Sequence, residues 1–210
     1  ENKIPFLGIC LGMQMAMVAF ARNVLGYADA NSSELDPETT HPVVDLMPDQ
    51  NGIENLGGTL RLGSYPCVLD KKSKAYALYG TELINERHRH RFEINNHYRD
   101  DFTSHGMMIS GQSPDGHIVE MIELPDHPFY VGIQAHPEFK SRPNHAHPLF
   151  AGFVESAEEQ GVLRRAKKLL MKRNHLSEPE AHRYLQKTSM DTGRTMTESA
   201  HMVTMLIHED

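Results

Sequence analysis

IPFLGICLGMQMAMVAFA, residues 4–21, decides how the fold begins. Its first six residues form an apolar run that predicts a short buried strand, and residues 12–25 carry apolar side chains at helical spacing. A strand, a turn and a helix therefore follow each other directly, with Cys10 at the turn.

Cys10 lies between Gly8 and Gly12, which is typical of a nucleophile elbow. Glycines on both sides relieve crowding at a strained turn, so that one side chain is held above the strand. A helix N-terminus also favours the thiolate form of a cysteine. The alternative is a core residue, because a lone cysteine after an apolar strand is usually buried. A nearby base is needed to decide between the two.

Composition indicates a globular, soluble and cytoplasmic protein. The 210 residues are 39% hydrophobic, enough for a substantial core, and no apolar run is long enough to span a bilayer. We find no secretory leader in the sequence. The two cysteines, Cys10 and Cys67, are far apart, which predicts free thiols in a reducing compartment.

Seven strand candidates with interspersed helical patterns predict an α/β fold. They are residues 4–9, 43–47, 59–69, 88–94, 107–113, 117–124 and 129–135. Polar loops are expected at 29–42 and 48–58.

After residue 161 the pattern changes to three helices without an intervening strand, so residues 162–210 are expected to form a small all-α domain after a first domain at 1–158. Capping boxes beginning at Ser177 and Thr195 open the second and third helices. The net charge is −9 for residues 1–158 and +2 for residues 159–210, which indicates different partners or simply two solvated surfaces.

The candidate base is in YVGIQAHPEF, residues 130–139. His136 follows a predicted buried strand, and Glu138 is close enough in sequence to orient the imidazole. A cysteine, a histidine and an orienting carboxylate are what acyl transfer by a thiolate requires. With 14 histidines in the chain, a structural role for His136 is the alternative.

GICLGMQ followed by HPEF resembles the class I (triad) glutamine amidotransferases, and SSELDPETTHPVVDLMPDQ, GGTLRLG and ERHRHRFEINN are similar to the amidotransferase domain of CTP synthases. The resemblance covers residues 1 to about 157. It implies a flavodoxin-like mixed sheet with flanking helices, truncated at its N-terminus. It also implies Cys10 as nucleophile, His136 as general base and acid, and Glu138 as the orienting acid.

The same resemblance implies glutamine contacts at Leu11, Gln14, Glu34 and Arg91, with the backbone N–H of Leu11 helping to hold the oxyanion. An acid suits the ammonium group of an amino-acid substrate, and a cation suits its carboxylate. Strand alternation puts Arg89 and Arg91 on one face, and the family pattern selects Arg91. Without the resemblance, a solvated basic edge strand explains the arginines equally well.

The resemblance implies ammonia supply for amination of UTP to CTP on a synthetase domain outside these residues. ATP and Mg²⁺ would belong to that domain, so no cofactor and no metal site are expected here. A glycine-rich loop that gives the family its second oxyanion donor precedes the residues of this sequence, and losing one donor typically costs about 10²–10³ in rate. An inactive or glutamine-sensing domain is therefore the alternative.

Residues from about 162 to 207 resemble an ANTAR domain, the RNA-binding module of bacterial transcription antiterminators. The matching positions are Ala166-Lys167, Leu170-Met171, Ser177-Glu178, Ala181 and Ser189-Met190-Asp191. The resemblance implies binding of RNA hairpins through basic side chains, with Lys167, Lys168, Arg173 and Arg194 as candidates. An antitermination regulator is thus the second functional hypothesis, and a bundle that only packs or dimerises is the third.

Overall fold

The computed structural model describes residues 3–46 and 61–207. The chain divides into two compact units, residues 1–153 and residues 154–210. The expected loop at 48–58 and the first two residues of the strand expected at 59–69 lie outside the described residues. Within the described ranges, no helix has both the length and the apolarity needed to cross a bilayer.

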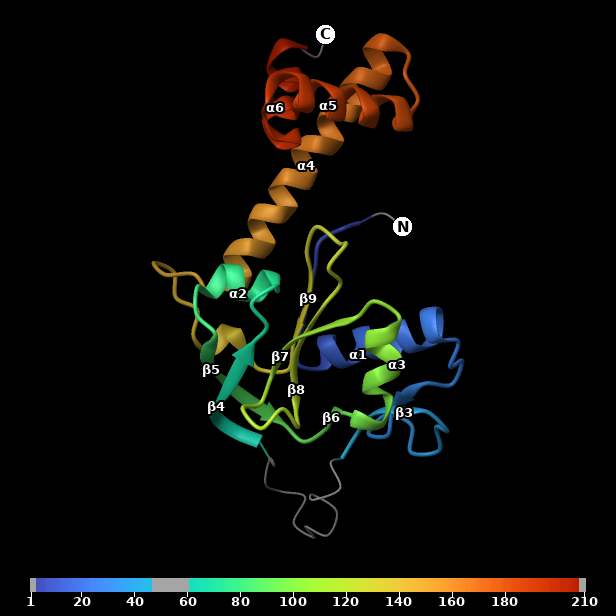
Figure 1. The fold of residues 1–210 in the computed structure, drawn as a ribbon, viewed down its shortest axis with the longest axis vertical. Coiled ribbons are helices and arrows are strands. Elements are labelled where there is room, and N and C mark those ends of the chain that lie inside the picture. Colours follow the sequence, from blue (N-terminus) through green and yellow to red (C-terminus); the bar gives the residue numbers. More distant parts are fainter. Residues whose placement is uncertain (1–2, 47–60, 208–210) are drawn as a thin grey trace. The chain divides into compact units, whose positions relative to one another are not determined.

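A six-stranded mixed sheet forms the centre of the first unit (Figure 1). Its order is β1-β9-β8-β7-β4-β5, and β1 pairs with β9 in parallel whereas the other neighbours are antiparallel. The strands are β1 (Phe6–Ile9), β4 (Arg61–Leu69), β5 (Leu83–His90), β7 (Met108–Gln112), β8 (Val119–Glu123) and β9 (Tyr130–Ile133). The mixed sheet with flanking helices confirms the expected α/β fold.

Helices cover both faces of this sheet, because successive side chains of a strand point to opposite faces. On β8, Ile122 packs with the buried side of α1 and with Phe102 of α3. Its neighbour Met121 packs in a second cluster with residues of β9, with Ala75 of α2 and with Leu149. Figure 1 shows α1 and α3 on one side of the strands and α2 on the other. The helices are α1 (Leu11–Phe20), α2 (Lys74–Tyr79) and α3 (Arg99–Ser104), with a π-helical turn η1 (Ala21–Leu25) and 3₁₀ turns η3 (Asn96–Tyr98) and η4 (Pro137–Phe139).

The strand expected at 88–94 is wrong in its bounds. The chain instead forms β5 from Leu83 and then changes sheets, so that β6 (Glu93–Ile94) joins β2 (Asn31–Ser32) and β3 (Pro42–Asp45) in a three-stranded sheet. Three of the four buried positions of β5 are Glu86, His88 and His90. Because the inward side chains are polar, hydrophobic alternation could not reveal this strand.

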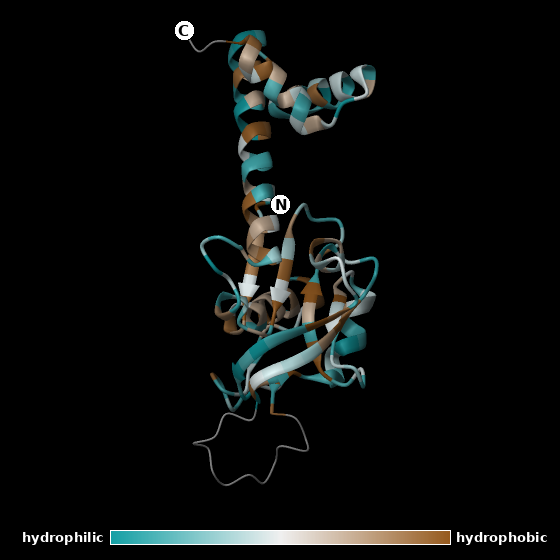
Figure 2. Cartoon of the chain, turned by 90° about the vertical axis from the view of Figure 1, so that its left-hand side faces the viewer, coloured by the Kyte–Doolittle hydropathy of each residue, from teal (hydrophilic) through white to brown (hydrophobic). Residues whose placement is uncertain are grey.

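Three helices dominate the second unit, as expected. They are α4 (Pro148–Asn174), α5 (Glu178–Thr192) and α6 (Met196–Leu206), and the capping boxes at Ser177 and Thr195 are both formed. Hydrophobic and hydrophilic residues alternate along α4 (Figure 2), which lets one side of the helix contribute to a small core. That core contains Ala166, Leu170, Ala181, Leu185, Ala200 and Val203.

The boundary between the two units falls within α4. The sequence places it at 158–162, near Gly161, whereas the helix runs through this glycine without interruption and the units separate between Phe153 and Val154. A glycine inside a helix costs roughly 1 kcal/mol relative to alanine but does not end it.

Candidate active site

Cys10 occupies a strained turn between β1 and α1. Its φ of 49° and ψ of −108° lie outside the regions that L-residues ordinarily populate. A Cβ on Gly8 would lie 2.9 Å from backbone atoms of Gly12 and Met13, so the close approach of helix to strand requires glycine there. The backbone N–H of Cys10 donates to Ile133 O of β9 at 2.8 Å. The local geometry is that of the expected elbow.

The thiol of Cys10 is partly buried, and its surroundings oppose each other. Burial raises its pKa, and the carboxylates of Glu138 and Glu93 act in the same direction. Hydrogen bonds from the backbone N–H of Leu11 and from the side chain of Gln134 lower the pKa, but the net shift is upward. The expectation that the helix N-terminus makes this thiol more acidic is therefore wrong for the free protein, because desolvation outweighs the donors.

His136 and Glu138 form the expected pair at the 3₁₀ turn η4. Nδ1 of His136 lies 2.7 Å from Oε1 of Glu138, which fixes the ring and leaves Nε2 as the nitrogen for proton exchange. Nε2 is buried and has no hydrogen-bond partner among the described residues. The backbone N–H of His136 donates to Arg87 O at 2.7 Å, so the turn is held against β5.

Strand pairing brings Cys10 and His136 to the same end of the sheet. β1 and β9 are adjacent and parallel, with Ile9 opposite Ile133. Cys10 follows β1 directly, and His136 follows β9 by three residues. Because the carboxyl ends of parallel strands meet at one edge, the two side chains belong to one site although they are far apart in sequence.

Glu34 and Arg91 also lie together. Nη2 of Arg91 is 3.6 Å from Oε1 of Glu34, and the two side chains are 35% and 40% exposed respectively. Gln14 differs, because it is 97% buried and both its side-chain N–H groups are engaged within the protein. Leu11 is half-exposed at the first position of α1.

A buried charge cluster lies inside the sheet next to this edge; it consists of Arg61, His88, His90, Glu93 and Glu120. Nη2 of Arg61 is 2.7 Å from Glu120, and Nη1 is 3.5 Å from Glu93. Nδ1 of His88 is 2.9 Å from Nε2 of His90. Burial and the charge of Arg61 lower the pKa of His88 to about 2 and of His90 to about 3, so both are neutral. Burial raises the pKa of Glu93 to about 8.

The four basic candidates of the second unit differ in environment. Lys167 is paired, with Nζ 2.6 Å from Oε1 of Glu178, whereas Lys168 and Arg173 are exposed on α4. Arg194 is exposed next to α6, and its guanidinium contacts Sδ of Met202. Lys168 and Arg173 are thus better placed than Lys167 for contacts with an external anion.

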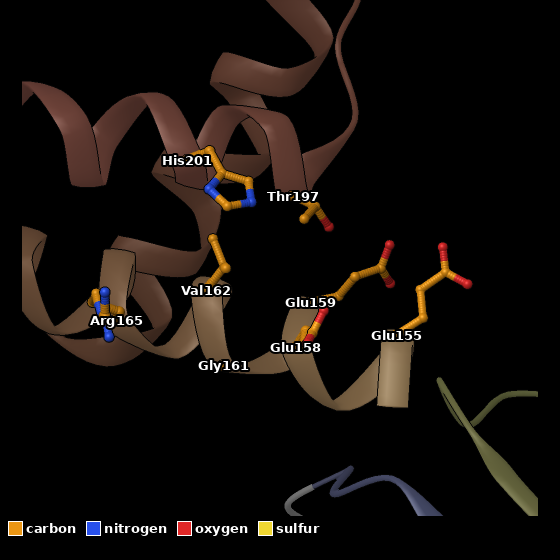
Figure 3. Close-up of a pocket in the computed structure, with 8 residues that line it drawn as sticks. All are labelled: Glu155, Glu158, Glu159, Gly161, Val162, Arg165, Thr197 and His201. Carbon is orange, nitrogen blue, oxygen red and sulfur yellow. The ribbon is translucent and has the colours of Figure 1, made fainter. Parts of the chain in front are cut away.

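A hollow of about 500 Å³ lies on the second unit between α4 and the start of α6 (Figure 3). Its lining includes Glu155, Glu158, Glu159, Arg165 and His201. None of the four basic candidates lines it. In the described part of the chain, no three His, Cys, Asp or Glu side chains are arranged to hold a metal ion.

Two family models match the chain. The model described as glutamine amidotransferase class-I matches residues 1–156, which is most of the sequence. The chain belongs to the class-I glutamine amidotransferase family. The model described as ANTAR domain matches residues 153–203.

Amidotransferase relatives are closely similar in sequence and in structure. The CTP synthase of Clostridium beijerinckii is 61% identical over 160 residues, which are 76% of this chain and 30% of that protein. The CTP synthase of Thermomicrobium roseum is 60% identical over 158 residues, which are 75% of this chain and 28% of that protein. A solved glutaminase domain of Trypanosoma brucei CTPS with bound acivicin has a TM-score of 0.71 and 35% identity, covering 75% of this chain and 61% of that one. The chain spans about 30% of the length of these curated relatives.

The structure of this amidotransferase chain also contains site residues that the sequence did not reveal. Gln134 lies beside the sulfur of Cys10, and Glu93 acts on the same thiol electrostatically. Gln134 is in the quoted motif two residues before His136, where strand alternation puts both side chains on one face, and that was the available signal. Glu93 gave no such signal, because it acts through space from another sheet.

Proposed function

We propose that residues 1–153 hydrolyse glutamine to glutamate and ammonia through Cys10, His136 and Glu138. The observation that carries this proposal is the strained cysteine at the end of β1 beside the end of β9, from which a carboxylate-bound histidine follows. A buried structural cysteine would need neither the positive φ nor a histidine with an unpartnered ring nitrogen.

The chemistry follows from the roles of these groups. The sulfur of Cys10 attacks the side-chain carbonyl carbon of glutamine while His136 takes the thiol proton, and the N–H of Leu11 stabilises the oxyanion. His136 then gives its proton to the leaving nitrogen, so ammonia departs and a thioester remains. Water, deprotonated by the same imidazole, releases glutamate.

Glu34 and Arg91 would hold the amino-acid end of the substrate. A carboxylate pairs with the α-ammonium group, and a guanidinium pairs with the α-carboxylate. In the free protein these two side chains face each other at 3.6 Å, so each already satisfies the charge that the substrate would replace. Both are partly exposed, which lets them separate at a low desolvation cost.

We infer further that the ammonia serves amination of UTP to CTP in the cytoplasm on a synthetase domain, which would bind ATP and Mg²⁺. The support is the name shared by the curated relatives, together with the 28–30% of their length that this chain matches.

Glutamate release from glutamine by the whole chain tests the first proposal. We expect measurable release, together with covalent or tight occupation of the site by acivicin, as detected by mass spectrometry of the Cys10 peptide. Acivicin is the molecule bound in the trypanosomal glutaminase domain. A folded chain that neither releases glutamate nor binds acivicin would contradict glutamine hydrolysis and favour a regulatory domain.

RNA binding by residues 154–210 is the second candidate function. It is supported by the match to the ANTAR domain and by the exposed cations Lys168, Arg173 and Arg194. The second unit would then bind the loop and phosphates of an RNA hairpin and act in antitermination.

Replacing Lys168 and Arg173 together with alanine is expected to weaken binding of a 20-nucleotide RNA hairpin by about tenfold or more, because each lost phosphate contact releases fewer counterions. The slope of log Kd against log salt should fall by roughly 1.5 to 2. Fluorescence anisotropy at several salt concentrations measures both. Lys72→Ala, an exposed lysine of the first unit, is the control. An unchanged slope in the double variant would contradict the assignment.

A further inference from the structure

Two buried glutamine side chains connect the sulfur of Cys10 to the backbone of the chain. Nε2 of Gln134 lies 3.7 Å from Sγ of Cys10, within the range of a hydrogen bond to sulfur. Nε2 of Gln14 lies 3.3 Å from Oε1 of Gln134 and 3.0 Å from Phe92 O. Gln134 is fully buried and Gln14 is 3% exposed.

The backbone carbonyl of Phe92 determines the orientation of both amides. A carbonyl oxygen only accepts, so Gln14 must present its NH₂ group there, and its second N–H then points to Gln134. Gln134 must answer with its oxygen, because two facing NH₂ groups would repel. Its own NH₂ group is consequently directed at the sulfur of Cys10.

This arrangement is costly unless the sulfur needs a donor. Burying a glutamine amide without compensation costs free energy, and an amide donor is a weak partner for a neutral thiol but a strong one for a thiolate. We propose that Gln134 is a catalytic residue whose side-chain amide stabilises the thiolate of Cys10, and that Gln14 is a positioning residue that holds this amide in the donating orientation. The proposal rests on the proposed glutamine hydrolysis only for the substrate that the thiolate attacks.

The other charged groups that face the thiol act in different ways. Glu138 on η4 and Glu93 on β6 both raise the pKa of Cys10, and burial raises it most. His136 follows β9 and supplies the base. Neither carboxylate bonds to Gln134, so a change at that glutamine alters the donor and leaves these groups in place.

Gln134→Met removes the donor with little change of volume. We expect the pH midpoint for alkylation of Cys10 by iodoacetamide, measured without glutamine, to rise by roughly one unit. At a fixed pH below that midpoint the reaction would be about tenfold slower. Mass spectrometry of the Cys10 peptide excludes any contribution from Cys67. Glutamine hydrolysis should lose kcat with little change of KM.

Gln14→Met should shift the alkylation midpoint in the same direction by less, and the double variant should match Gln134→Met alone because both act through one hydrogen bond. Gln112→Met, at another glutamine of the same sheet, should leave the midpoint unchanged. An unchanged midpoint in folded Gln134→Met would overturn the proposal. If that variant does not fold, Gln14→Met decides: a rise supports the proposal, and no shift overturns it. Because alkylation needs no substrate, a chain inactive toward glutamine still gives the answer.

Discussion

Cys10→Ala is expected to reduce glutamate release from glutamine by on the order of 10⁶-fold, the largest effect of any substitution in this chain. The methyl group cannot form the thioester, and His136 and Glu138 then have no nucleophile to activate. The positive φ at position 10 stays with the elbow, so alanine changes the chemistry and not the backbone path. Initial rates with a coupled glutamate assay measure the loss.

Cys67→Ala is the matched control for this substitution. Cys67 is 2% exposed and lies in the core of the sheet, so its removal should lower stability slightly and leave the rate unchanged. Binding of an RNA hairpin should be equal in Cys10→Ala and in the unmodified chain, because it is assigned to residues 154–210. Residual glutamate release within tenfold of normal in Cys10→Ala would refute a thiol nucleophile.

Arg61→Met is expected to lower the free energy of unfolding of the first unit by about 3–5 kcal/mol at pH 8. Arg61 is the cation that contacts both Glu93 and Glu120, and all three side chains are at least 93% buried. Its removal would leave two carboxyl groups in the protein interior with only neutral histidines beside them.

The effect of Arg61→Met should depend on pH with a definite sign. Burial raises the pKa of Glu93 to about 8 from an ordinary value of 4.5, so the folded state holds this proton more tightly than the unfolded state. Stability therefore falls as pH rises from 4.5 to 8. Loss of the arginine, which lowers the pKa of both carboxyls, makes this decline steeper. The destabilisation should be clearly smaller at pH 5 than at pH 8.

Urea denaturation followed by tyrosine signals can measure this, because Tyr184 is the one tyrosine of the sequence beyond residue 153. Arg87→Met is the control: it lies on β5 with its side chain exposed, on the opposite face from His88, and should change stability by less than about 0.5 kcal/mol. Equal losses for the two variants, or no dependence on pH, would show that the cluster is not held by Arg61.

The sequence was sufficient for the elbow and the strand before His136, because both depend on local patterns. Two glycines around a cysteine after an apolar run allow few backbone paths, and the structure has the one expected. The pairing of β1 with β9 is different. No local pattern specifies that two strands more than 100 residues apart are neighbours, and the motif resemblance supplied that link.

The polar interior was beyond sequence reasoning for a physical reason. In RHRHR the arginines are the obvious functional residues, yet the histidines between them are the buried ones, and their neutrality depends on Arg61 from the adjacent strand. Likewise, Lys167 looks like a free cation until α5 brings Glu178 to 2.6 Å. Partners of this kind are set by tertiary packing rather than by spacing in the chain.

The pairing of the first strand with the last strand of the sheet has a consequence during synthesis. Cys10 and Gln134 are 124 residues apart, and β1 must wait for β9 before its ladder can form. Contacts of such high sequence separation form slowly and late. A ribosome-bound chain that ends before residue 130 thus carries an ordinary, unstrained thiol at position 10. Its reactivity begins only when the nearly complete domain has emerged, which protects the nascent chain from premature chemistry at its own nucleophile.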